Sequence, residues 1–231
     1  MHGARRIRKM SDLWRDPTLD AAHAKNVNYR GVENIIGAAR ASGTCKRIVR
    51  ITGKGETPWS VFSILLNFMG SMAKAWNYEG ERLLRGCDGL EYTIIRPGVM
   101  RGDASDLAAA SLALADNGGD LKVASIPHDA IADLCVRSLS YPNAGRSTLC
   151  AMTVPTGEGA DDWAPLLRRV RADSRSFRGD DLLKEHFTAV RVGGAAFVAI
   201  ALAAVLSAGA LLLTMAKAVV AAVAAAGLRL R

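Results

Sequence analysis

The stretch GLEYTIIRPGVM, residues 89 to 100, indicates the fold of this chain. Gly89 marks a turn, the β-branched and aromatic run after it is typical of a buried strand, and Arg-Pro-Gly ends that strand abruptly. Open α/β sheets bind ligands in the crevice beyond the carboxyl ends of their strands. We therefore expect Pro97, Gly98 and Val99 to lie at a ligand-binding edge, although the same tripeptide also serves simply to end a strand and turn the chain.

The segments around this stretch predict an α/β fold. RIVRIT (47–52) reads as a short buried strand, and residues 59–85 read as one long helix between it and EYTIIRP. Two neighbouring strands joined in this way are parallel, with a crossover helix between them. The later pattern predicts a helix over 106–115, a strand over 122–126, a helix capped by Asp129, a strand over 147–154, and two Arg-rich amphipathic helices over 163–171 and 181–190. We expect the helices to cover both faces of the sheet.

The tail of the chain has a different composition. Residues 192–216 are 25 residues without a charge, and Lys217 then interrupts the run. A helix needs about 20 apolar residues to cross a bilayer core. The sequence predicts a single-pass membrane protein whose bilayer contact is 192–216; an Ala-rich helix packed in an oligomer is the alternative. The earlier apolar run 61–69 is too short to span and is expected in the core.

These patterns divide the chain into four parts: an irregular arm (1–25), a partial Rossmann-like domain (26–155), a basic amphipathic connector (156–191) and the transmembrane helix with its short tail (192–231). The net charge is +8, but the cationic residues are scattered and not interleaved with aromatic ones, so we expect no nucleic-acid partner. The four cysteines have no metal-ligand spacing, so we expect no metal. No apolar secretory signal is visible at the N-terminus.

Four blocks of the sequence together carry a family resemblance. They are NVNYRGVENIIGAARASG, KRIVRITG, GERLLRGCDGLEYTIIRPG and IPHDAIADLCVRSL, within residues 26–154. They resemble successive blocks of the atypical short-chain dehydrogenases/reductases, a family that includes the NmrA-like regulators. The resemblance implies a Rossmann fold, NADP or NAD as the cofactor, and a small-molecule substrate.

In that family a glycine-rich loop after the first strand brings the backbone close to the pyrophosphate. Residues 1–25 hold one glycine, Gly3, and no buried strand. Gly53 and Gly55 follow a strand, but the third glycine and the acidic strand end are missing, so we do not interpret them as this loop. The chain therefore resembles the C-terminal portion of the fold, from a truncated or a degenerate protein. A half sheet also predicts an exposed edge and a possible oligomer through it.

The family's catalytic pattern is incomplete in this sequence. Taking Glu81 as the family's glutamate places Asn77 at the lysine position and Ala73 at the tyrosine position, so we predict no catalytic residue. The resemblance implies cofactor contacts from Thr52, Asn77, Pro97, Gly98 and Val99; Thr52 is equally an ordinary β-branched strand end. Three functions remain open: a membrane-anchored NAD(P)-binding reductase-like protein, a non-catalytic membrane-bound regulator or assembly factor on the same scaffold, and a soluble NAD(P) sensor if the tail is not in a membrane.

Overall fold

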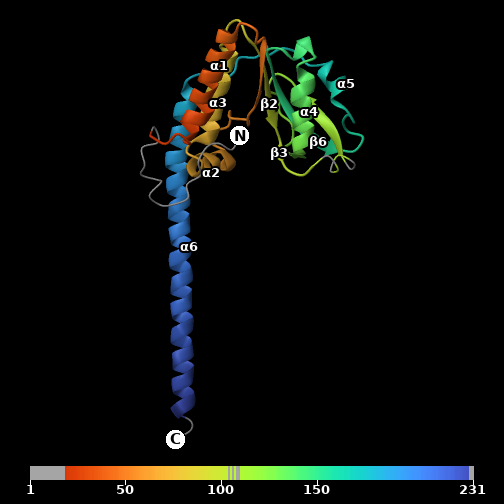
Figure 1. Cartoon of the computed structure of the whole chain (residues 1–231). Coiled ribbons are helices and arrows are strands. Elements are labelled where there is room, and N and C mark those ends of the chain that lie inside the picture. The colour runs from red at the N-terminus through yellow and green to blue at the C-terminus, as the bar shows by residue number, and fades with distance from the viewer. Residues whose placement is uncertain (1–18, 104, 106, 108–109, 229–231) are drawn as a thin grey trace.

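The chain folds into an α/β domain from which one long helix projects (Figure 1). The computed structural model describes residues 19–103, 105, 107 and 110–228. Most of the predicted irregular arm, residues 1–18, lies outside them.

The central sheet has four strands in the order β1-β2-β6-β4. β1 (Arg47–Ile51), β2 (Glu91–Pro97) and β6 (Ser147–Pro155) are parallel, as the sequence predicted. β4 (Ala110–Ala115) pairs antiparallel with β6. Within the described residues no strand pairs with the outer side of β1. A second sheet joins β3 (Val99–Met100) to β5 (Ser125–Ile126), so the strand predicted over 122–126 shrinks to its last two residues.

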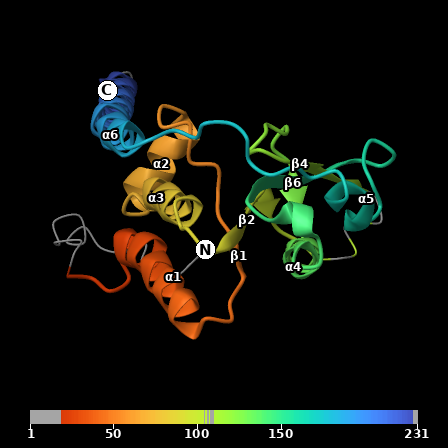
Figure 2. The same ribbon diagram turned by 90° about the horizontal axis from the view of Figure 1, so that it is seen from above.

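Helices flank both faces of the sheet (Figure 2). On one face α1 (Gly31–Ser42) and α3 (Ala73–Arg85) cover Tyr92 and Ile94 of β2. On the other face α4 (His128–Ser138) and α5 (Trp163–Leu167) bury Ile95 and Leu149. The alternation of β2 side chains between the two cores follows from the two-residue period of a strand. The α/β fold class is confirmed.

Three predictions about local structure were wrong. The helix expected over 59–85 is two helices, α2 (Val61–Met69) and α3, separated at Gly70 and by Ser71 and Met72 with positive φ. Where a helix was expected over 106–115, Ala110–Ala115 forms β4, because its pairing with β6 outweighs the helix propensity of Ala and Leu. Asp129 does not cap α4: the capping position is Pro127, and no side chain bonds the free amides there.

The prediction that the apolar run 61–69 lies in the core was also wrong. Val61, Phe62 and Met69 of α2 are each more than half exposed.

A short helical segment, η2 (Asn26–Arg30), precedes α1, and a 3₁₀ turn, η4 (Pro142–Ala144), precedes β6.

The last helix, α6, runs from Asp181 to Leu228 without a break. Its first turns pack on α2 and α3 and bury Leu182, His186 and Ala189, whereas the later part extends away from the domain (Figure 1). The part from Asp181 to Ala218 is long and apolar enough to cross a membrane, with a mean hydropathy of 2.6 and no burial in its most apolar window. One such helix is by itself a weak indication of a membrane protein.

Candidate functional site

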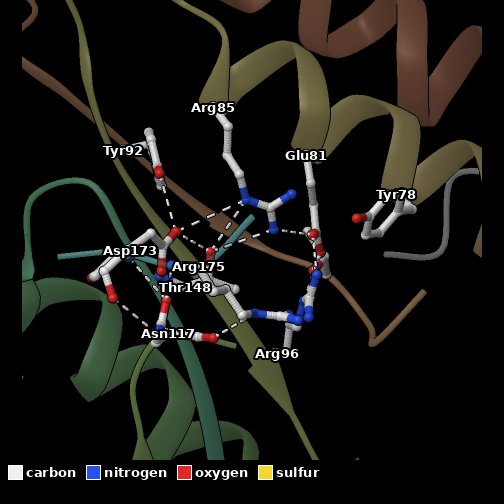
Figure 3. Close-up of polar contacts among 12 residues, drawn as sticks. Tyr78, Glu81, Arg85, Tyr92, Arg96, Asn117, Thr148, Asp173 and Arg175 are labelled. Carbon is white, nitrogen blue, oxygen red and sulfur yellow. Dashed lines mark hydrogen bonds and ion pairs between the residues drawn. The ribbon is translucent and has the colours of Figure 1, made fainter. Parts of the chain in front are cut away.

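Charged side chains gather where α3 meets the carboxyl half of β2 (Figure 3). The strand residue Arg96 points toward the helix residues Glu81 and Arg85, and the segment after α5 closes over them with Asp173 and Arg175. An arginine in a buried strand requires carboxylate partners, since an unpaired charge there is strongly unfavourable. The charged side chains of the cluster are arranged around this need of Arg96 for carboxylate partners.

Glu81 is the centre of this network and is fully buried. Its Oε2 accepts bonds of 2.5 Å from Arg96 Nη2 and from Arg85 Nη2, and its Oε1 accepts from Arg96 Nε at 3.1 Å and from the Thr52 hydroxyl. Burial alone would raise the pKa of Glu81, but Arg96 and then Arg85 outweigh it, and the net pKa lies below its ordinary value. Glu81 is therefore an ionised structural group with no free acceptor for substrate chemistry.

A second carboxylate completes the pairing of Arg96. Glu56 Oε2 accepts from Arg96 Nη1 and from Arg175 Nη2, both at 2.7 Å. The Phe177 ring lies beside these arginines. Its centroid is 4.1 Å from the guanidinium carbon of Arg175 and 3.8 Å from that of Arg85. Burial lowers the pKa of Arg96, but the two glutamates raise it by more, so Arg96 stays charged.

Asp173 ties the covering segment to the sheet. Its carboxylate accepts from the Thr148 amide at 2.9 Å, the Thr148 hydroxyl at 2.6 Å and the Tyr92 hydroxyl at 3.0 Å. Burial, and next the charge of Asp173, raise the pKa of Tyr92 to about 12. Within the described residues Glu56 Oε1 and Arg85 Nη1 are buried without a hydrogen-bond partner, but the bonds of the other groups hold α3, β2 and residues 171–178 together.

Thr52 and Asn77, predicted as cofactor contacts, both lie beside this network. Thr52 is fully buried, its hydroxyl donates to Glu81, and its amide donates to Ile95 O at 2.8 Å. Asn77 is buried, and its Oδ1 accepts from Arg50 Nη2 at 3.1 Å. A cofactor would have to displace these protein partners to use the Thr52 hydroxyl as a donor or Asn77 Oδ1 as an acceptor.

Pro97, Gly98 and Val99 lie at the next strand end and lead into β3. A Cβ on Gly98 would lie 2.1 Å from Ala124 O, so this glycine is required by the close approach of a neighbouring backbone. Val99 is half exposed. Beside them is an open cavity of about 450 Å³ that the sequence did not reveal; its lining is Arg101, Gly102, Ala110, Ser125, Pro127 and Thr153.

The positions predicted to correspond to the family's catalytic pair, Ala73 and Asn77, hold no acid. Ala73 begins α3, and Asn77 follows one turn later. The neighbouring Tyr78 is buried, and its hydroxyl donates to Arg178 O at 3.1 Å. Burial, followed by the charge of Glu56, raises the pKa of Tyr78 to about 12, so this phenol is not poised to donate a proton near neutral pH.

The described residues fit a nicotinamide cofactor poorly. Gly55, one of the two glycines after β1, packs on Tyr78: a Cβ there would lie 2.6 Å from the Tyr78 Cβ. The backbone at Gly55 is therefore used for packing and, through its carbonyl, for a 2.7 Å contact with His186 Nε2.

Sequence comparison nevertheless gives a clear family. A family model described as NAD(P)H-binding matches residues 17–142, more than half of the chain. The chain belongs to this NAD(P)H-binding family. The result confirms the resemblance drawn from the sequence blocks.

One curated relative is an uncharacterized chloroplastic protein of Arabidopsis thaliana. It is 28% identical over 141 residues, which are 61% of this chain and 42% of the relative. The chain thus spans less than half of the relative's length.

Solved structures of the same general fold are similar at low identity. A wide-type short-chain dehydrogenase/reductase of Veillonella parvula in complex with NADP has 14% identity and a TM-score of 0.43 over 57% of this chain and 60% of that one. An oxidoreductase of Lactococcus lactis has 16% identity and a TM-score of 0.47, covering 65% of each chain. A Rossmann-fold NAD(P)-binding family protein of Shigella flexneri has 14% identity and a TM-score of 0.38, covering 71% and 74%.

Proposed function

We propose that this chain is a membrane-anchored, non-catalytic member of the NAD(P)H-binding family, a regulator or assembly factor whose Rossmann-type scaffold is held at a bilayer by α6. The observation that carries the anchoring is the exposed apolar part of α6, which continues directly from the folded domain. An apolar helix with no protein around it leaves its whole surface to be covered by lipid.

The dimensions of α6 support a single span. The 25 uncharged residues 192–216 extend about 37 Å at 1.5 Å per residue. A hydrocarbon core of roughly 30 Å is crossed by such a helix with some tilt. Arg191 and Lys217 border the run, and both are suited to reach the headgroups at its two ends.

Extraction of membranes tests the anchoring. The full chain should stay in the membrane pellet after alkaline carbonate and after high salt, whereas a variant lacking residues 192–231 should appear in the supernatant. Release of the full chain by carbonate would contradict the proposal.

The absence of chemistry rests on α3 and the strand end after β1. Ala73 and Asn77 supply neither a proton donor nor the cation that lowers a phenol pKa. The Thr52 hydroxyl donates its hydrogen bond to Glu81. These arrangements support the proposal of a protein that keeps the packed fold of the family and lacks catalytic activity.

The second candidate is a membrane-anchored reductase-like protein that binds NADP or NAD through Thr52, Asn77, Pro97, Gly98 and Val99. Its support is the family membership of residues 17–142. Isothermal titration of the full chain with NADPH and with NADH separates the two: we expect no low-micromolar binding of either. Low-micromolar affinity would favour the reductase-like protein.

The outer edge of β1 is the proposed contact for an oligomer, because the described residues leave its backbone groups without a neighbouring strand.

A further inference from the structure

Helix α2 has its polar side inward and its apolar side outward. Its fully buried side chains are Ser63 and Asn67. Its exposed side chains are Val61, Phe62, Leu66 and Met69, at 73%, 65%, 39% and 54% of full exposure. A surface helix of a soluble domain shows the opposite arrangement. The outward side of α2 is therefore not the polar side expected of a helix that faces water.

The inward polar groups are well bonded, so the orientation of α2 is set by specific contacts. Asn67 Oδ1 accepts from the amides of Lys74 and Ala75 at 3.0 and 3.1 Å, and Asn67 Nδ2 lies 2.9 Å from His186 Nδ1. Ser63 Oγ accepts from Lys74 Nζ at 2.5 Å. Turning the apolar side inward would break these bonds and leave buried polar groups unpaired.

α2 crosses α6 at the point where the charges of α6 end. Cβ atoms on Gly193 and Gly194 would lie 2.8 Å from Ile64 Cδ1 and 3.3 Å from Phe68 Cδ2, so these two glycines allow the close contact. Arg191 is the last charged residue before the uncharged run. α2 thus lies beside the first turn of the apolar part of α6, where α6 leaves the domain (Figure 1).

We propose that α2 is an in-plane membrane helix: its apolar face, made by Val61, Phe62, Leu66 and Met69, is inserted at the lipid–water boundary around α6. This inference rests on the proposed anchoring by α6 and adds that the domain lies on the bilayer in one orientation. An interfacial helix inserts its apolar face about 5–10 Å into the headgroup and acyl boundary. The start of the uncharged run at the α2–α6 crossing places α2 at that depth.

Two further residues are compatible with a lipid surface. Trp59, directly before α2, is 54% exposed, and Trp is enriched at the membrane interface. Lys184, on the part of α6 that lies toward the domain, is largely exposed and suits anionic headgroups. α2 packs on α6, and both helices have exposed apolar side chains, so a single bilayer would cover both.

Tryptophan quenching in vesicles tests this proposal. The full chain is reconstituted in phosphatidylcholine and phosphatidylglycerol vesicles, with or without bromine on the acyl chains near the headgroup. Phe62→Trp is compared with Val136→Trp, which is 68% exposed near the C-terminal end of α4, and the wild-type signal is subtracted from both. We expect the added fluorescence of Phe62→Trp to be largely lost in brominated vesicles and that of Val136→Trp to be retained. Met69→Trp, on the same face, should behave as Phe62→Trp does.

Carbonate extraction of the same samples separates this inference from the anchoring. Loss of the Phe62→Trp signal supports the in-plane helix, even for a chain that carbonate releases, a release that would contradict only the transmembrane span. An unquenched Phe62→Trp in a carbonate-resistant chain overturns the in-plane helix and leaves the anchor. An unquenched but blue-shifted Phe62→Trp in a chain that cross-links to a dimer overturns it in favour of a second copy on this face.

Discussion

Glu81 holds two arginines and a threonine in place, and its loss should weaken the whole domain. In Glu81→Gln the charges of Arg85 and Arg96 stay buried without their shared carboxylate. Removing one partner of a buried ion pair costs about 3–5 kcal/mol. For a chain of this size we expect the Tm to fall by about 10 °C.

Thermal unfolding in mild detergent, followed by circular dichroism, measures this change. Glu33→Gln on the exposed side of α1 is the control and should leave the Tm unchanged. Equal values of Tm for Glu81→Gln and the wild type would show that the network does not stabilise the domain.

Stability should also fall at acidic pH through the same carboxylates. The pKa values of Glu81 and Glu56 in the folded chain lie below their ordinary value of 4.5: burial opposes ionisation in both, but arginine partners outweigh it. Because the folded chain binds these protons less readily than the unfolded one, their contribution is complete above pH 4.5 and is lost as the pH falls below it. The wild-type Tm should drop as the pH falls below about 4.5, and by less in Glu81→Gln.

At the level of single residues, the sequence allowed Glu81 to be assigned as the family's glutamate, but it did not show which residues Glu81 contacts. Arg96 in the apolar run EYTIIRP is a signal that a carboxylate lies nearby, since a buried guanidinium needs one. Glu56, the second carboxylate partner of Arg96, lies far from it in the chain, and no local pattern links the two. The cofactor contacts predicted for Thr52 and Asn77 stay predictions, and each group has a protein partner in the structure.

At the level of elements, the parallel strands were predictable and the helix boundaries were not. RIVRI and EYTIIRP are β-branched runs between turn residues, a pattern with few alternatives. Residues 106–115 read as a helix by composition and form a strand in part because β6 offers a free edge. The run 61–69 was assigned to the core because hydrophobicity alone does not show which side of a helix its few polar residues, Ser63 and Asn67, will occupy.

The contact between α3 and η2 depends on Gly80. A Cβ at this position would lie 2.2 Å from Asn28 O and 2.5 Å from Arg50 Nη1, and the first of these atoms belongs to the backbone. We expect Gly80→Ala to separate η2 from α3 and to destabilise the chain by about 1–3 kcal/mol, the usual range for overpacking.

Gly37→Ala is the matched control, because Gly37 is also in a helix and its Cβ would meet nothing within 4 Å. It should be neutral or add roughly 0.5–1 kcal/mol of stability. Urea unfolding of both variants measures the difference, and a Gly80→Ala variant as stable as Gly37→Ala would contradict the packing described.

At the scale of the whole molecule, the ligand edge of the sheet and α2 lie at one end. α3 begins next to α2 and runs away from it, and β2 returns, so the carboxyl ends of the strands face the side from which α6 projects (Figure 1). If α2 lies on the bilayer as proposed, this edge and the cavity beside Arg101 face the lipid. A ligand that reaches it would come from the membrane side.

The first turns of α6 belong to the domain, so their removal should destabilise it. Leu182 and Ala189 are buried, and the His186 ring lies between Asn67 and the Gly55 carbonyl. A chain ending at residue 195 keeps these contacts and the crossing with α2, whereas a chain ending at residue 180 loses all of them. In mild detergent the longer variant should unfold cooperatively and resist limited proteolysis. The shorter variant should be cleaved within α2, because each buried polar group left unpaired costs about 1–3 kcal/mol and the apolar contacts of α2 with α6 are also lost. Equal protection of the two variants would show that the domain is complete without α6.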